Sequence, residues 1–334
     1  MSAVGKGSFV IVLLLCLGGG LLQRSFAQDV KRLRYGVSPA TTHLPIWAAK
    51  EGGLFSKYGL DVEVILMRGG PLNTLAIVSG QMQLSSAGAE SVVAARTEGA
   101  DLVLLACPID ADPVYLIARP EIKNPAELKN KTSGVSRLGS TTHFYLRAAL
   151  KQVGIDADKD IRILQLGTSS EVAVALETGR IAVAALTVRN AIRFLDKGWP
   201  LLVDLSKTHF VYPPSCVTSS RAFLKEQPGT VERVLKAYVE GIRRLKKDRA
   251  FAERVYAKTY RETDPRIIKK TVEVYAELFK PIPYVPDQGI DVVVKQLAQQ
   301  RPLPKGFVSR AEQFRDNGPL DKLVKEGWID QLYR

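Results

Sequence analysis

Two short stretches of the chain carry the same polar residues in the same order. "GVSPATTHL" runs from Gly36 to Leu44, and "GVSRLGSTTHFYL" runs from Gly134 to Leu146. Each has GVS followed by TTH, so that His43 and His143 stand 100 positions apart. In both stretches an apolar run ends, and hydroxyl-rich residues precede an apolar helical pattern. Each stretch therefore predicts a strand that leads into the exposed start of a helix.

The start of a helix can hold a polar or anionic group, because its first N–H groups lack partners and carry positive partial charge. Gly139 would let such a group approach the backbone closely. Hydroxyl side chains at the two helix starts are those of Thr41, Thr42, Ser140, Thr141 and Thr142. Each hydroxyl alone could simply cap its helix. The duplication favours ligand contact at both helix starts.

Histidine and arginine side chains near these helix starts could contact the same ligand. A helix start favours the neutral form of His43 and His143, which can donate one hydrogen bond and accept another. A structural role for both stays open, and two histidines alone do not predict a metal site, which usually has three or four ligands. Arg68, Arg137 and Arg189 follow predicted strands and suit a planar anion, although surface arginines are common in a basic chain.

Sequence motifs of catalysis are absent from the chain. There is no GxSxG, Walker or GxGxxG motif, and only three histidines are present. Asp110 and Asp112 flank a predicted connection between lobes, where they contact either ligand or solvent. We therefore expect a protein that is not an enzyme and that has no cofactor and no metal.

The order of the predicted elements indicates two α/β lobes in tandem. The first series has strands at 32–37, 60–67, 81–88 and 101–107, with helices at 42–52, 69–80 and 89–99. The series then restarts, with strands at 133–136, 161–167 and 180–188 and helices at 140–154 and 169–179. The helix-ending glycines Gly80 and Gly179 repeat at nearly the spacing of the histidines. This alternation predicts a mainly parallel sheet covered by helices in each lobe.

Two extended connections, residues 107–131 and 211–224, suit a chain that crosses to a second lobe and then returns. From Phe223 onward the pattern is helical, interrupted by "KPIPYVPDQG", and we expect these helices to pack on the first lobe. The predicted boundaries are 30–112 and 218–334 for lobe I and 113–217 for lobe II.

The first 27 residues have the pattern of a cleaved secretory signal. An apolar run follows Lys6, and "SFA" places small residues before a cleavage site after Ala27. A membrane anchor is one alternative, but the apolar part is short and Arg24 interrupts it. A lipoprotein, with Cys16 as the lipidated residue, is the other alternative. Export predicts a periplasmic protein in which Cys107 and Cys216 could form a disulfide. They lie far apart in sequence, so their spacing does not decide whether they pair, and two buried free thiols are the preferred interpretation.

The formal net charge is +13, and the excess is greatest between Arg221 and Lys270, with 15 basic and 7 acidic residues. Because the acids lie three or four positions from the bases, the pattern indicates a solvated helix face. A surface that faces anionic lipid or an acidic partner is the alternative. No aromatic-plus-basic motif is present, so we do not expect binding to nucleic acid.

Longer segments resemble the solute-binding proteins of ABC importers, in the class for nitrate, sulfonates, taurine and pyrimidine precursors. The most specific are "AAKEGGLFSKYGLDVEV" and "SRLGSTTHFYLRAAL", and the resemblance runs from about Leu33 to Arg334. It implies a two-lobed periplasmic clamp of the doubly crossed type (type II). The chain departs from the family where Gln83 and Ala182 replace a frequent acid.

The corner residues and the resemblance together define the predicted ligand-binding set. Its members are Thr41, Thr42, His43, Arg68, Gly70, Ser86, Gly88, Ala89, Asp110, Arg137, Gly139, Ser140, Thr141, Thr142, His143 and Thr187. The predicted function is the capture of a small polar or anionic solute between the lobes by a monomer that delivers it to an ABC permease in the inner membrane. An exported sensor of the same fold and a small-molecule enzyme on this scaffold are the alternatives.

Overall fold

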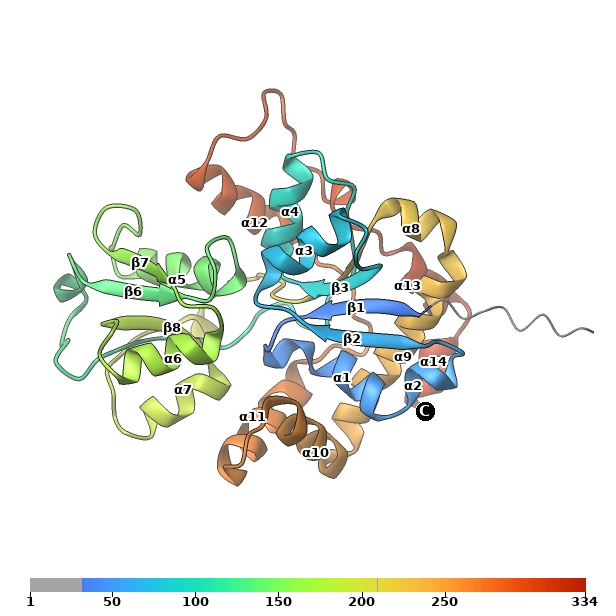
Figure 1. The fold of residues 1–334 in the computed structure, drawn as a ribbon, viewed down its shortest axis with the longest axis horizontal. Coiled ribbons are helices and arrows are strands. Elements are labelled where there is room, and N and C mark those ends of the chain that lie inside the picture. The colour runs from blue at the N-terminus through green and yellow to red at the C-terminus, as the bar shows by residue number, and fades with distance from the viewer. Residues whose placement is uncertain (1–31, 209) are drawn as a thin grey trace, which may run out of the picture. The chain divides into compact units, whose positions relative to one another are not determined.

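The computed structural model describes residues 32–208 and 210–334. Two five-stranded sheets, each covered by helices, form two lobes (Figure 1). The predicted signal segment, residues 1–27, lies outside the described residues. Within those residues, no helix has the length and apolar character needed to cross a membrane.

The first sheet belongs to lobe I. Its strands are β1 (Leu33–Val37), β2 (Val62–Leu66), β3 (Leu84–Ala87), β4 (Val103–Ala106) and β10 (Cys216–Ser219). The strand order is β2-β1-β3-β10-β4, with β1 parallel to β2 and β3, and β10 antiparallel to β3 and β4. Every residue of the inner strand β3 and of the edge strand β4 is buried, as expected for a sheet covered on both faces.

The second sheet repeats this arrangement in lobe II. Its strands are β5 (Val114–Ala118), β6 (Thr132–Val135), β7 (Arg162–Gln165), β8 (Val183–Thr187) and β9 (Leu201–Asp204). The order is β7-β6-β8-β5-β9, in which β6 is parallel to β7 and β8, and β5 is antiparallel to β8 and β9. The mainly parallel, duplicated architecture predicted from the sequence is confirmed.

The antiparallel strand of each sheet is the strand that enters from the other lobe. β5 follows the first crossing and β10 follows the second, and they occupy the same place in the two sheets. β10 lies as a whole in the first sheet. The return crossing therefore ends before Cys216, and the expected boundary between 217 and 218 divides a strand.

Helices cover both sheets. In the first part of the chain they are η1 (Thr41–His43), α1 (Leu44–Glu51), α2 (Leu54–Lys57), α3 (Gly70–Val78), α4 (Ala89–Thr97), η2 (Pro125–Leu128), α5 (Thr141–Gln152), α6 (Ser169–Glu177), α7 (Val188–Leu195) and η3 (Leu205–Lys207). The predicted strand through Val188 is wrong at its end, because Val188 begins α7. Val188, Ala191 and Phe194 are buried at a spacing of three, which is a helical face. Neither α7 nor the four-residue strand β9 is predicted from the sequence.

The C-terminal third is helical, as predicted. Its helices are α8 (Arg221–Glu226), α9 (Pro228–Lys247), α10 (Arg249–Tyr260), α11 (Pro265–Leu278), α12 (Asp287–Gln300), η4 (Ala311–Gln313), α13 (Gly318–Lys325) and α14 (Trp328–Tyr333). The long helix α9 packs directly on α1. A Cβ at Gly241 would lie 2.7 Å from the Pro45 carbonyl oxygen, so only glycine allows this approach. The C-terminal helices therefore complete the core of lobe I.

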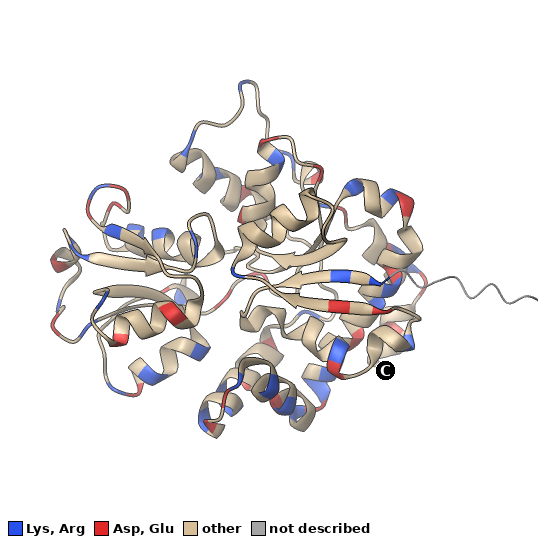
Figure 2. Ribbon diagram, in the orientation of Figure 1, with Lys and Arg blue, Asp and Glu red and all other residues tan. Residues whose placement is uncertain are grey.

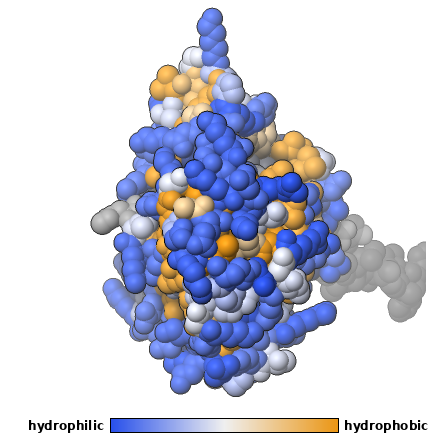
Figure 3. All heavy atoms as spheres, turned by 90° about the vertical axis from the view of Figure 1, so that its left-hand side faces the viewer, coloured by the Kyte–Doolittle hydropathy of each residue, from blue (hydrophilic) through white to orange (hydrophobic). Residues whose placement is uncertain are grey.

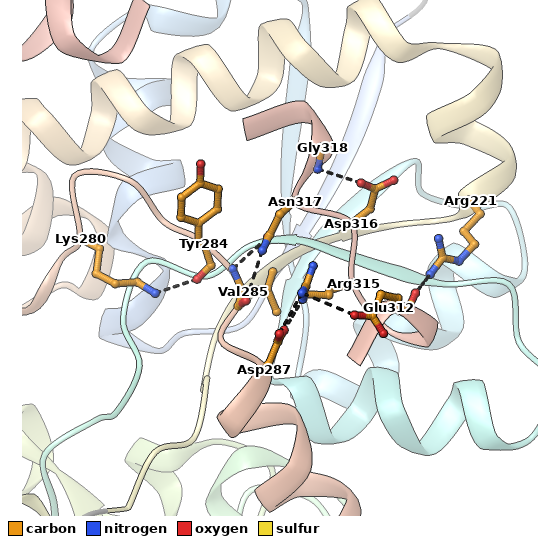
Figure 4. A network of polar contacts seen from close by, with 10 residues as sticks. All are labelled: Arg221, Lys280, Tyr284, Val285, Asp287, Glu312, Arg315, Asp316, Asn317 and Gly318. Carbon is orange, nitrogen blue, oxygen red and sulfur yellow. Dashed lines mark hydrogen bonds and ion pairs between the residues drawn. The ribbon is translucent and has the colours of Figure 1, made fainter. Parts of the chain in front are cut away.

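Two loops of this region are joined by a polar network (Figure 4). Arg315 donates to both carboxylate oxygens of Asp287, at the start of α12. Asn317 Oδ1 accepts the Val285 N–H at 3.1 Å, and Arg221 donates to the Glu312 carbonyl at 2.8 Å. These bonds hold the loop before α13 against the Pro-rich segment that interrupts the helices.

Acidic residues are interspersed among the basic residues of α9 to α11 (Figure 2). Lys258 pairs with Glu51 at 2.5 Å, and Arg249 pairs with Glu253 at 2.9 Å. Glu240 of α9 accepts from Lys57 at 2.7 Å. These ion pairs agree with a solvated helix face.

Cys107 and Cys216 form a disulfide, so the prediction of two free thiols is wrong. Cys107 directly follows β4 and Cys216 begins β10, and these strands are neighbours in the sheet. The sheet thus brings together two residues separated by 109 positions. The loop that the disulfide closes contains all five strands of lobe II.

Replacing both cysteines by alanine should lower the free energy of unfolding by about 2–5 kcal/mol, because the disulfide closes a long loop in the unfolded chain. Urea denaturation followed by circular dichroism measures this loss. Reductant should lower the stability of the wild type but not that of the variant. Alkylation of Cys107 and Cys216 in denatured, unreduced wild type would contradict the pairing.

Candidate functional site

A cleft of about 720 Å³, open solvent at its mouth included, is lined by residues of both lobes. Its walls are the loops that follow the carboxyl ends of the parallel strands, where ligands bind in open α/β sheets. The lining residues are Ser38, Pro39, Ala40, Thr41, Thr42, His43, Gly69, Gly70, Gly88, Asp112, Ser136, Ser140, Thr141, Thr142, Tyr145, Gly167, Thr168, Ser169, Thr187, Arg189, Asn190 and Pro214. Both copies of the repeated corner therefore border one cleft.

The lobe I corner leads from β1 into η1 and α1. Thr41, Thr42 and His43 are buried, and the backbone of Ala40 is extended before the helix begins. The Tyr260 hydroxyl donates to the Ala40 carbonyl at 2.7 Å, which fixes the corner on α10.

The lobe II corner leads from β6 into α5 and contains three hydroxyls that bond one another. The Ser136, Ser140 and Thr142 oxygens lie 2.8–3.0 Å apart. Thr142 Oγ1 also accepts the Ser136 N–H at 2.9 Å. These hydroxyls orient the loop before α5.

Helix starts from both lobes surround the cleft. The described residues supply no side-chain cap to η1, α3, α4, α5 or α7, whereas Thr168 caps α6. First-turn N–H groups of an uncapped helix are open to a ligand unless another protein group accepts them, as the Pro213 carbonyl accepts the Ala89 N–H of α4. Aligned peptide dipoles make the same region electropositive. The cleft is therefore suited to an anionic or strongly polar group.

The two histidines of the repeat differ in position and in tautomer. His43 lines the cleft, and its Nδ1 lies 2.8 Å from the Ser38 carbonyl and 3.2 Å from the Ser38 N–H. The shorter contact, to an acceptor, assigns the proton to Nδ1. His143 lies outside the cleft, and its Nδ1 accepts the Gly139 N–H at 3.1 Å, so the proton is on Nε2. Burial lowers the pKa of each imidazole to about 4. Both rings are neutral at physiological pH, and His43 presents an acceptor nitrogen.

Arg189 and Asp112 are the charged residues among the described residues that line the cleft. Arg189 Nη2 donates to the Tyr260 carbonyl at 3.2 Å, and the guanidinium lies 4.9 Å from the Tyr260 ring centroid. Arg189 Nε is buried without a partner in the described chain. Asp112 accepts from the hydroxyls of Tyr145 and Tyr275, and burial raises the pKa of its carboxyl to about 7.

Nine of the predicted ligand-binding residues line the cleft: Thr41, Thr42, His43, Gly70, Gly88, Ser140, Thr141, Thr142 and Thr187. Two of the predicted arginines lie at the rim of the cleft instead, because their guanidinium groups already bond to other protein groups. Arg68 pairs with Glu171 of the opposite lobe at 2.5 Å, and Arg137 donates to the Arg68 carbonyl at 3.1 Å. Arg68 and Arg137 therefore bridge the lobes.

The other five predicted residues also lie outside the cleft lining. Ser86 is buried against the Tyr35 hydroxyl at 2.8 Å, and the Ala89 N–H bonds the Pro213 carbonyl. Asp110 pairs with Lys280 at 2.5 Å, and Gly139 accepts from Ser91. His143, the fifth, contacts Gly139. These side chains or backbone groups already have protein partners.

Several residues that line the cleft do not belong to the predicted set. Thr168 and Ser169 occupy the place in lobe II that Gly69 and Gly70 occupy in lobe I, so the repeat itself could have identified them. Asp112 and Arg189, whose charges the sequence singles out, also line the cleft without belonging to the predicted set. Tyr145 lies one turn into α5 and carries no recognisable signal. Among residues 32–208 and 210–334, no group of three or more His, Cys, Asp and Glu could hold a metal ion.

Known proteins resemble this chain in sequence. The NMT1/THI5-like family model matches residues 40–250, more than half of the chain. YtlA, a candidate binding protein of Bacillus subtilis (strain 168), is 22% identical over 284 residues, which cover 80% of this chain and 83% of YtlA.

Solved structures share its fold. The alkanesulfonate-binding protein SsuA from Xanthomonas axonopodis pv. citri, bound to MOPS, has a TM-score of 0.69 at 22% identity, over 85% of this chain and 98% of SsuA. The desulfurization enzyme DszB has a TM-score of 0.62 at 14% identity, over 88% and 99% of the two chains. The periplasmic binding-protein fold expected from the sequence is confirmed.

Gly88→Ala should destabilise the protein by about 1–3 kcal/mol through overpacking. Its backbone angle φ of −66° suits alanine, but the new Cβ would lie 2.5 Å from Thr141 Oγ1 and would also clash with Glu90. Gly229→Ala on α9 is the matched control, because its Cβ would meet no atom within 4 Å. Urea denaturation that gives equal stabilities for the two variants would refute the close packing at Gly88.

The tautomers of the two histidines can be read directly by long-range ¹H–¹⁵N correlation spectroscopy. Between pH 6 and 8 we expect the proton of His43 on Nδ1 and that of His143 on Nε2, with neither ring titrating near its ordinary pKa. A shared tautomer would contradict the assigned hydrogen bonds.

Proposed function

Because the chain belongs to the NMT1/THI5-like family, we propose that it is the solute-binding component of an ABC importer. It captures a small polar or anionic organic molecule between its lobes and delivers the molecule to a permease in the inner membrane. The observation that carries the proposal is the ring of uncapped helix starts from both lobes around one cleft.

The charges of the cleft support an anionic group on the ligand. Arg189 holds a buried Nε without a partner in the described chain, next to the start of α7. A guanidinium and free backbone N–H groups together bind carboxylates and sulfonates well. The fold similarity to an alkanesulfonate-binding protein supports the same class of ligand.

Export and a monomeric state belong to the same proposal. The secretory pattern of residues 1–27 supports a periplasmic location, and the Cys107–Cys216 disulfide suits an oxidising compartment. The outer face of lobe II is mostly hydrophilic with scattered apolar groups, which supports a monomer (Figure 3). We do not propose nucleic acid as a binding partner of the basic face of α9 to α11.

A second candidate is a small-molecule enzyme on this scaffold, which the fold similarity to DszB favours. Turnover of a bound compound, lost on replacing His43, would support that candidate. A sensor that signals to a membrane receptor would use the same clamp. Uptake of the ligand should be lost in cells that lack an importer component, whereas cells that lack a sensor should still take the ligand up.

A thermal-shift screen of sulfonates, carboxylates, nitrate and pyrimidines should yield a ligand that raises the melting temperature, since it binds only the folded state. Arg189→Met should then weaken binding of that ligand at least tenfold in calorimetry. Arg193→Met is the control, because Arg193 lies one turn further along α7 and does not line the cleft. Equal losses in the two variants would exclude Arg189 as the anion contact.

A further inference from the structure

Two carboxyl groups are buried where the lobes meet. Glu90, near the start of α4, is 7% exposed, and Asp112, in the first crossing, is 6% exposed. The predicted ligand-binding set contains neither residue. Burial of a carboxyl requires hydrogen-bond partners, which identify what each acid holds together.

Glu90 connects lobe I to the other lobe and to the second crossing. Its Oε1 accepts the Thr141 hydroxyl at 3.0 Å from the start of α5. Its Oε2 accepts the hydroxyl of Tyr212, in the segment that returns to lobe I. Ser91 of α4 donates to Oε1 at 3.1 Å. One carboxyl thus joins α4, α5 and the second crossing.

Asp112 makes the equivalent connection from the first crossing. Its Oδ2 lies 3.3 Å from the Tyr145 hydroxyl of α5, and its Oδ1 accepts the Tyr275 hydroxyl of α11. α5 belongs to lobe II, whereas α11 packs on lobe I. The second carboxyl therefore also spans the two lobes.

Both connections end on the same face of α5, because Thr141 and Tyr145 are four residues apart. The Tyr145 and Tyr212 rings contact each other edge to face, with centroids 5.3 Å apart. We call these six residues the acid–hydroxyl network: Glu90, Asp112, Thr141, Tyr145, Tyr212 and Tyr275. Opening the lobes would separate α5 from α4 and α11 and would expose both carboxyls.

No basic side chain is hydrogen-bonded to either acid among the described residues. The neutral His143 lines a small pocket with Glu90, whose other titratable neighbours are Tyr145 and Tyr212.

Asp112 faces Tyr115, Tyr145 and Tyr275, and it shares the cleft with Arg189 and the neutral His43. Nearby Lys280 is bonded to Asp110 instead. Ionisation of either acid in the closed arrangement is therefore unfavourable.

We infer that closure of the two lobes takes up protons at Glu90 and Asp112, so that acidic solution favours the closed clamp and rising pH opens it. The inference rests on the proposed function only in requiring a clamp that opens. It concerns the empty protein and is independent of the identity of the ligand.

The direction of the effect follows from burial. Burial raises the pKa of each acid to about 7, although the hydroxyl bonds lower it. Exposure in an open form would return both acids to ordinary pKa values near 4. Below about pH 4 both forms are protonated, and closure carries no penalty. Between about pH 4 and 7 only the open form ionises, so each pH unit lowers the closed-to-open ratio by up to about tenfold per acid. Above about pH 7 the effect levels off.

Single-molecule energy transfer between the lobes measures this ratio without a ligand. Dyes are placed at Leu75→Cys on α3 and Val174→Cys on α6, in a chain that also carries Cys16→Ser. These two side chains are 59% and 52% exposed, and the native cysteines are buried in a disulfide. We expect the closed-to-open ratio of the otherwise unchanged protein to fall at least tenfold between pH 5 and pH 8.

Variants separate this mechanism from a general effect of pH. Glu90→Gln with Asp112→Asn mimics the protonated acids and should reduce the fall to less than twofold, with each single variant intermediate. Glu171→Gln is the matched control, because it removes a lobe-bridging carboxylate that is exposed at the rim. Because the pKa of Glu171 lies below its ordinary value, the loss should lower the closed-to-open ratio equally between pH 5 and pH 8 and leave the fall intact.

A constant ratio in the otherwise unchanged protein would overturn the inference, even if the double variant failed to fold. A fall that persists in a folded double variant would overturn it as well. Circular dichroism and melting curves establish that the variants fold. Failure of the ligand screen would leave this result untouched, and a constant ratio would not affect ligand binding.

Discussion

The chain crosses between its lobes twice, and the two crossings leave and enter lobe I at neighbouring strands, β4 and β10. This constraint explains why each sheet is parallel except for one strand, since β5 and β10 enter from the opposite lobe and pair antiparallel. It also explains the disulfide, because the first passage leaves lobe I beside the strand through which the second returns. Motion of one lobe against the other must therefore pass through a small, covalently tied region.

The same region contains the polar groups that respond to closure. Tyr212 belongs to one crossing and donates to Glu90, which also accepts from Thr141 of α5. Asp112 belongs to the other crossing and accepts from Tyr145 of α5. α5 also supplies Thr141 and Thr142 to the cleft. One helix thus couples the ligand-facing wall to the buried carboxyls behind it, so that ligand contact and proton uptake act on the same motion.

Charge is distributed differently inside the cleft and at its rim. Arg68 and Arg137 bridge the lobes at the rim, where solvent screens their interactions. Inside, free helix N–H groups and Arg189 provide the positive potential, and burial raises the pKa of Asp112 to about 7, so that its carboxyl is only partly ionised near neutral pH. The interior can therefore bind an anion while the rim stabilises the closed arrangement.

The repeat in the sequence was sufficient to predict two similar lobes, their sheets and the placement of both TTH corners at one cleft. Periodicity and helix-start residues are local signals, so they survive in the sequence alone. The pairing of Arg68 with Glu171 and that of Cys107 with Cys216 join residues 103 and 109 positions apart, and the partners of the buried Glu90 lie 51 and 122 positions away. Only the tertiary structure decided these, because a side chain's charge state and bonding are set by the groups that the folded chain places around it.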